Sequence, residues 1–305
     1  MNINPDYLIE RKRNKKQLTK WKILSFLLVI GLLYNFKHNM RFDGSNLTQS
    51  ATKEYIASIK IQEVIFDDLD RIKRLQNIKD NDNIKALIVN INSPGGSVVG
   101  SEMLYNSLRK IAKVKPVVVV MGSLAASGGY LTALGGDYIV AHNGTLTGSI
   151  GVIIQSAEVT ELAEKLGIKF DNFKSDPLKA VPNPTEKVTP EIRQATMETI
   201  NDVYDYFIEQ VALRRNLNID YVRQIADGRV YSGHQALKLK LIDELGDEDT
   251  ALDWLHNYKN ISPTLKVVGV KLKSKDKIWD ILLKDIQGNL SNFVYSNFAG
   301  IKSLM

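Results

Sequence analysis

Residues 116–130 read Pro-Val-Val-Val-Val-Met-Gly-Ser-Leu-Ala-Ala-Ser-Gly-Gly-Tyr. The first half is a continuous run of β-branched and other apolar residues, typical of a strand buried on both faces of a parallel sheet. In the second half, the hydroxyl residue Ser127 precedes Gly128 and Gly129, and glycines let backbone N–H groups approach a ligand closely. We interpret Ser127 as a nucleophile on a strand-to-helix turn, with a helix N-cap as the alternative role.

The segments around this run predict an α/β domain. Apolar and turn-rich segments alternate with segments of helical periodicity, as expected for right-handed crossovers between parallel strands. The expected strands are 55–61, 86–91, 138–141 and 150–155, and the expected helices are 67–78, a helix from 97 onward, 159–166, 191–215 and a short one after 246. Four prolines predict a loop over 177–190. Without an internal repeat, we expect one catalytic domain over 53–261 and a basic C-terminal extension of unassigned role over 262–305.

The N-terminal part of the chain predicts a membrane anchor. Residues 1–22 hold seven lysines and arginines against two acidic residues, and so carry most of the net charge of +6. The apolar run 23–36 spans only about 21 Å as a helix, against a hydrocarbon core of roughly 30 Å, so flanking lysines must snorkel. A cleaved signal peptide and a buried helix are the alternatives. The positive charge places residues 1–22 in the cytoplasm and, after a linker over 37–52, the domain on the extracytoplasmic side.

A second glycine-rich turn follows the strand expected at 86–91. Residues 92–96 read Asn-Ser-Pro-Gly-Gly, and the carboxyl ends of neighbouring parallel strands meet at one edge of a sheet. A tetrahedral intermediate needs two N–H donors about 3 Å from its negative oxygen. Gly128, together with Gly95 or Gly96, meets that need, whereas an ordinary turn is the alternative for residues 93–96.

The nucleophile also needs a base. Cysteine is absent, and the four histidines lack any metal-ligand spacing, so we expect neither a metal nor another cofactor. His142 lies beside an Asn-Gly pair, which favours a role in a turn. A lysine can act as base if burial lowers its pKa. Lys179, 52 residues after Ser127, has apolar neighbours that suit this demand, although a loop lysine is commonly a solvated charge; the hydroxyl of Ser149 can hold a neutral amine.

Five ordered motifs between residues 55 and 255 resemble the signal peptide peptidase A family, membrane-anchored Ser/Lys endopeptidases with the ClpP/crotonase-like fold and its repeated β-β-α units. The motifs occupy residues 92–96, 122–130, 147–151, 174–179 and 228–246. The resemblance implies that Ser127 is the nucleophile, Lys179 the base, Ser149 the residue that orients the lysine, and Gly128 with Gly95 and Gly96 the oxyanion hole. Lys174 is the alternative base, because residues 180–184 are less polar than the family pattern.

The resemblance also implies the partners. It predicts cleavage of remnant signal peptides, which are hydrophobic peptide substrates, next to membrane lipid, by a ring-like homo-oligomer in which serine and lysine come from neighbouring subunits. Basic and acidic residues nearly balance beyond residue 22, so no nucleic-acid partner is expected. The rival functions are an acyl-CoA enzyme of the crotonase type, a Ser-His-Asp peptidase that uses His142, and an inactive membrane scaffold.

Overall fold

The computed structural model describes residues 53–272. The predicted basic segment 1–22, anchor 23–36 and linker 37–52 lie outside the described residues, as does the C-terminal extension from residue 273 onward. Between residues 53 and 272, no helix has both the length and the apolar character that a membrane crossing requires.

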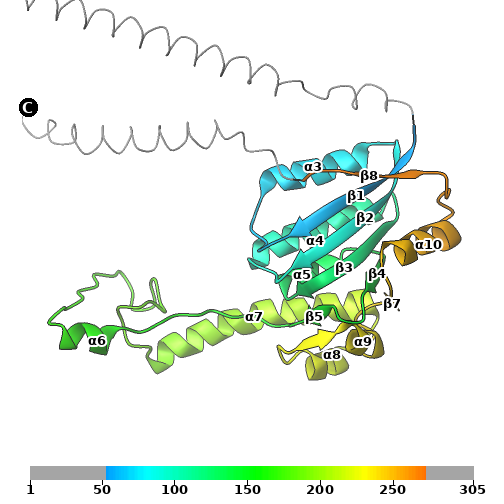
Figure 1. Cartoon of the computed structure of the whole chain (residues 1–305). Coiled ribbons are helices and arrows are strands. Elements are labelled where there is room, and N and C mark those ends of the chain that lie inside the picture. Colours follow the sequence, from blue (N-terminus) through cyan, green and yellow to red (C-terminus); the bar gives the residue numbers. More distant parts are fainter. Residues whose placement is uncertain (1–52, 273–305) are drawn as a thin grey trace, which may run out of the picture. The chain divides into compact units, whose positions relative to one another are not determined.

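An eight-stranded mixed sheet forms the centre of the domain (Figure 1). The main path runs β6-β5-β3-β2-β1-β8. Off this path, β4 pairs with β3, and β7 pairs with β4. All pairings are parallel except that of β5 with β6. The strands are β1 (Tyr55–Gln62), β2 (Ile84–Ser93), β3 (Val117–Ala126), β4 (Tyr138–Ala141), β5 (Leu146–Gly148), β6 (Val230–Ser232), β7 (Glu244–Leu245) and β8 (Lys266–Gly269).

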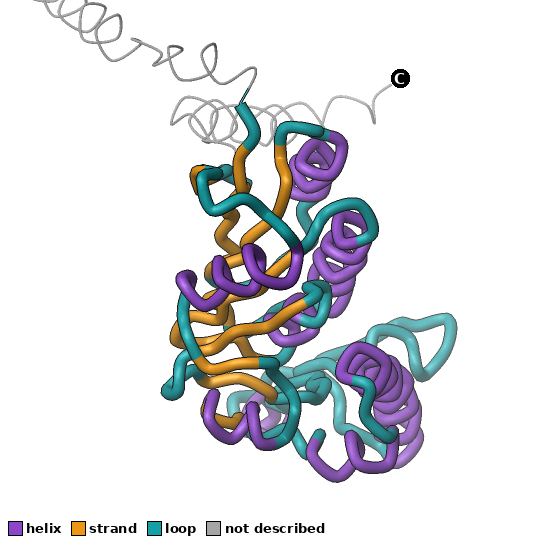
Figure 2. Tube along the Cα trace, turned by 90° about the vertical axis from the view of Figure 1, so that its right-hand side faces the viewer, coloured by secondary structure: helices purple, strands orange, loops and turns teal. Residues whose placement is uncertain are grey.

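Helices pack on both faces of this sheet (Figure 2). On one face, Leu87 and Val89 of β2 join the large core that includes residues of α3, α4, α5, α7 and α8. On the other face, Ile88 packs with Trp254 and Leu255 of α10. The helices are α3 (Leu69–Asp80), α4 (Val98–Ala112), α5 (Gly128–Ala133), α6 (Thr160–Lys165), α7 (Pro190–Arg215), α8 (Ile219–Ile225), α9 (Gly233–Lys238) and α10 (Glu248–Lys259).

The expected elements of the core are confirmed. Strands lie at 55–62, 84–93, 117–126 and 138–141, and helices at 69–80, 98–112, 160–165, 190–215 and 248–259. Apolar alternation and N-cap residues set these bounds: Asp68 accepts a hydrogen bond from Arg71 N, and Ser97 accepts one from Gly100 N. The mixed α/β architecture predicted from the sequence is therefore correct.

Two features differ from the prediction. Residues 150–155 do not form a strand; β5 lies earlier, at Leu146–Gly148, and pairs with the end of β3. Ile153 and Ile154 are exposed, so their apolar character reflects a surface and not a sheet core. The sheet also continues past residue 261, the end expected for the domain, because β8 pairs with β1 and Leu272 is buried.

Removing a core leucine should test this packing. Leu108 of α4 is fully buried, so Leu108→Ala leaves a cavity, and we expect a loss of about 3 kcal/mol in the free energy of unfolding. The matched control is Leu213→Ala in α7, where the side chain is 70% exposed and the expected change is within about 0.5 kcal/mol. Denaturant titration measures both; equal effects would contradict the assigned packing.

Candidate active site

The turn between β3 and α5 holds Ser127 in an unusual backbone conformation. Its φ of 52° and ψ of −122° lie outside the regions that residues with a side chain normally occupy. The Ser127 N–H donates to the carbonyl of Gly148, 2.8 Å away, which ties the turn to the end of β5. Ser127 stands at the N-cap position of α5, but its hydroxyl makes no capping hydrogen bond to the helix. Such local strain is typical of functional positions.

The turn after β2 packs directly against this serine. Gly95 has a φ of +99°, and a Cβ atom built on it would lie 2.6 Å from Gly128 N and 3.1 Å from Ser127 Cβ. A Cβ on Gly128 would lie 3.3 Å from Gly96 N and 2.1 Å from Ser101 Oγ. Only glycines allow the two backbone turns to approach this closely. The two glycine-rich segments expected at one sheet edge therefore meet there.

The amides of this junction differ in availability. Gly95 N–H donates to Ser93 Oγ at 3.1 Å, so this amide is engaged within the protein and is less available as an oxyanion donor than the sequence indicated. The N–H groups of Gly96 and Gly128 have no acceptor within residues 53–272. Gly95 therefore shapes the turn, while Gly96 and Gly128 present two free donors beside Ser127.

A pocket of about 100 Å³, lined by both apolar and polar residues, opens next to these groups. Ser127 and three residues of α7 are among its lining residues. The amphipathic pattern of residues 191–215 predicts a packing face for α7 but not this contribution to the pocket. Burial raises the pKa of Tyr206 to about 12, so its phenol is uncharged at neutral pH. The other lining residues are Gly96, Val98, Ser101, Gly128, Leu131, Gly151, Val152, Ile153, Val203 and Phe207.

Ser149 lies beside this junction, as expected from the sequence. The pairing of β5 with β3 places Gly148 opposite Ala126, so Ser149 and Ser127 leave neighbouring strands at the same level. Ser149 has a positive φ of 48°, and its N–H donates to the carbonyl of Arg229 at 2.9 Å. A hydroxyl next to the nucleophile is suited to orienting a base that approaches from outside.

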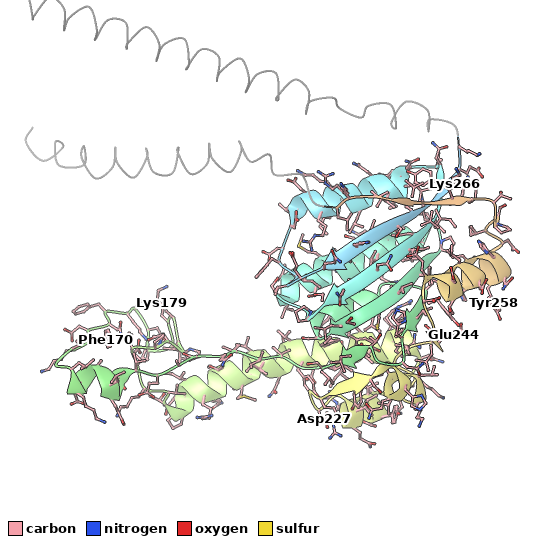
Figure 3. The ribbon with its side chains drawn as sticks, in the orientation of Figure 1. Phe170, Lys179, Asp227, Glu244, Tyr258 and Lys266 are labelled. Atoms are coloured by element: carbon pink, nitrogen blue, oxygen red, sulfur yellow. The ribbon has the colours of Figure 1, made fainter. Side chains whose placement is uncertain are left out.

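Lys179 does not meet Ser127 within one chain. It lies in the loop between α6 and α7, with its N–H bonded to the carbonyl of Asp176 at 3.1 Å. Figure 3 places it near Phe170, on the segment that carries α6 and apart from the sheet. Lys179 and its neighbour Leu178 are exposed, so the apolar surroundings expected for a neutral amine are absent from the described part of a single chain.

Lys174, the alternative base, is engaged in an ion pair. Its Nζ lies 2.5 Å from Glu186, and the two side chains are only 15% and 24% exposed. Hydrogen bonds from Lys174 and then from Asn183 hold the pKa of Glu186 below its ordinary value. A base needs a free electron pair, which an ion-paired ammonium lacks, so this arrangement disfavours Lys174 as the base.

His142 occupies the turn expected from its Asn-Gly neighbour. It is exposed, its N–H donates to Thr145 Oγ1 at 3.0 Å, and its carbonyl accepts from Thr145 N at 3.1 Å. These contacts are those of a tight turn after β4. They give no support to a Ser-His-Asp site.

The family model described as peptidase family S49 matches residues 109–262. The chain belongs to peptidase family S49. The matched range holds Ser127, Ser149 and Lys179, whereas Gly95 and Gly96 precede it. Membership in family S49 confirms the resemblance drawn from the motifs and makes the chain a serine peptidase.

Relatives of this S49 peptidase carry protease names. A protein provisionally named a protease in Synechocystis sp. is 36% identical over 217 residues, which cover 70% of this chain and 78% of that one. A protein of Enterococcus faecium, provisionally named signal peptide peptidase SppA, is 33% identical over 244 residues, 73% of this chain and 71% of that one. The chloroplastic serine protease SPPA of Arabidopsis thaliana is 32% identical over 202 residues, 66% of this chain and 30% of that one.

A methyl group at the glycine junction should disable the S49 peptidase. A Cβ on Gly128 would meet Ser101 Oγ at 2.1 Å, so Gly128→Ala must displace the turn that carries Ser127. Because a misplacement of about 1 Å can lower a rate on the order of a hundredfold, we expect a loss of that size in kcat with a peptide substrate. Gly144→Ala is the control, since no atom lies within 4 Å of its added carbon. Similar activities in both variants would refute the assignment.

Proposed function

We propose that this S49 peptidase is a membrane-anchored endopeptidase that cleaves remnant signal peptides with Ser127 as nucleophile and Lys179 as base. The observation that carries the proposal is the junction of Ser127 with the two free amides of Gly96 and Gly128, next to a pocket. A nucleophile, two convergent donors and a side-chain pocket are the parts that acyl transfer from a peptide requires.

The proposed reaction follows from these positions. Ser127 Oγ attacks the peptide carbonyl carbon while its proton passes to the neutral amine of Lys179. The carbonyl oxygen becomes negative and accepts hydrogen bonds from Gly96 N–H and Gly128 N–H. The C–N bond then breaks as Lys179 returns the proton to the leaving amine, and water hydrolyses the acyl ester on Ser127 with the same lysine as base. Ser149 orients the lysine amine.

The base is proposed to come from a neighbouring subunit of a ring-like homo-oligomer. Lys179 sits on a segment with many exposed apolar side chains, and Phe173 is 97% exposed. Apolar exposure over a whole segment is typical of a protein interface. Contact with a second copy would bury these side chains and supply the apolar surroundings that Lys179 lacks in one chain. The exposed apolar residues near it include Leu162, Leu166, Ile168, Phe170 and Leu178.

The substrate class and location rest on further sequence features. A pocket of about 100 Å³ whose lining includes Val98, Leu131 and Phe207 suits a small apolar side chain, such as those of signal peptides. The relative in Enterococcus faecium carries the name of a signal peptide peptidase. The apolar run 23–36 would anchor the chain in lipid, with residues 1–22 cytoplasmic and the domain outside. The ClpP/crotonase-like fold of repeated β-β-α units is proposed on the same resemblance.

Mixing two inactive variants tests the shared site. Ser127→Ala and Lys179→Met should each abolish cleavage of an apolar peptide reporter, because one lacks the nucleophile and the other the base. When subunits of the two variants are unfolded together, mixed equally and reassembled, a random ring regains roughly a quarter of the wild-type sites. Reporter turnover measures the recovery, with each variant reassembled alone as the control.

Two results would contradict the proposal. A mixture that assembles but stays inactive would show that serine and lysine do not act between subunits. Full activity in Lys179→Met alone would exclude this lysine as the base.

A further inference from the structure

The loop that carries Lys179 is closed at its base by a cluster of polar side chains. Within this loop, Lys174 Nζ on one side of Lys179 contacts both carboxylate oxygens of Glu186 on the other side, at 2.5 Å. Asn183 Nδ2 donates to Glu186 Oε1 and to the carbonyl of Ala180, each at 2.9 Å. The cluster therefore joins the parts of the loop before and after Lys179 and also reaches the residue next to Lys179.

Further hydrogen bonds hold Asn183 and the turn at Lys179 in place. The Asn183 side-chain oxygen accepts hydrogen bonds from both the N–H and the hydroxyl of Thr185, each at 2.9 Å, which fixes the amide plane. At the tip of the loop, Asp176 accepts from Leu178 N–H through its side chain at 3.0 Å and from Lys179 N–H through its carbonyl at 3.1 Å. The loop thus has a defined shape although most of it is exposed.

The two lysines of the loop differ in their ion pairing. Lys174 is paired with Glu186, whereas the amine of Lys179 forms no ion pair within residues 53–272. A carboxylate close to a catalytic lysine favours the charged ammonium and so opposes its role as a base. Two acidic residues are tied to the Lys179 turn. The Asp176 carboxylate accepts from Leu178 N–H, and the Glu186 carboxylate, linked through Asn183 to Ala180, is paired with Lys174.

We propose that Lys174, Glu186 and Asn183 form a clamp that fixes the Lys179 loop and so positions Lys179 for catalysis. Lys174 and Glu186 are then positioning residues and touch neither the substrate nor Ser127. The inference rests on the proposed role of Lys179 as the base. It goes beyond that role by assigning a positioning function to Lys174, the other lysine of the 174–179 motif.

Kinetics of the full-length, assembled enzyme test the clamp. We expect Lys174→Met and Glu186→Gln each to lower kcat for an apolar peptide reporter about tenfold, because the base loses its fixed position. KM should stay unchanged, since neither residue lines the pocket beside Ser127. Lys174→Arg keeps the ion pair and should retain most of the activity. The double variant should be no slower than either single one, as expected for two residues that act as a unit.

Lys187→Met provides the matched control on the same segment. Lys187 pairs with Glu161 at 3.7 Å, but both side chains are largely exposed, 67% and 75%, and such surface pairs contribute little. We expect wild-type kcat from this variant. Size-exclusion chromatography checks that every variant keeps the wild-type assembly, and a loss of activity that follows only from loss of assembly would overturn the clamp.

The possible failures can be told apart. If Lys174→Arg is as inactive as Lys179→Met, Lys174 is itself the base and the clamp is refuted. If Lys179→Met is inactive while Lys174→Met and Glu186→Gln keep wild-type kcat, Lys179 remains the base but needs no clamp. If Lys179→Met is fully active, the proposed function fails, and the inference fails with it.

Discussion

The close approach of two backbone turns at the carboxyl ends of β2 and β3 is the constraint on which the site depends. Between Ile91 and Ser93, β2 advances two residues while its partners on β3 advance four, from Met121 to Ala125. This irregularity leads both strands into glycine turns at one edge of the sheet. Gly95 then packs on the Ser127–Gly128 peptide, and any side chain there would separate the two turns.

The site is divided between a rigid part and an exposed part. The serine turn and the two free amides rest on buried strands, and α5 behind them is buried throughout. The lysine instead sits on a segment with little core of its own, where most side chains are exposed. Preorganised donors for the oxyanion require a rigid, buried support, such as that of the serine turn. Reaching a neighbouring subunit requires an exposed segment, such as the one that carries the lysine. The polar clamp around Glu186 compensates for the missing core by fixing the loop locally.

Much of the fold follows from the sequence because buried parallel strands leave continuous apolar runs, as residues 117–121 do. The serine turn and the 92–96 turn could be predicted because glycine pairs directly after such runs are specific. The prediction of a strand over 150–155 was wrong, since Ile150 is buried but Ile153 lines a pocket and Ile154 faces solvent. The choice of Gly96 over Gly95 depends on the Ser93 hydroxyl, which also donates to the carbonyl of Glu63, distant in the sequence. The ion pair of Lys174 depends on a partner twelve residues away, which no local pattern specifies.

The central claim is that Ser127 and the amides of Gly96 and Gly128 form one acyl-transfer site. A structure of the assembled enzyme with a peptide boronic acid tests it most directly, because such an inhibitor forms a tetrahedral adduct on the nucleophile. The account predicts a covalent bond to Ser127 Oγ, with one boronate oxygen about 3 Å from both Gly96 N and Gly128 N. An adduct on another residue, or an oxygen that contacts neither amide, would contradict the account.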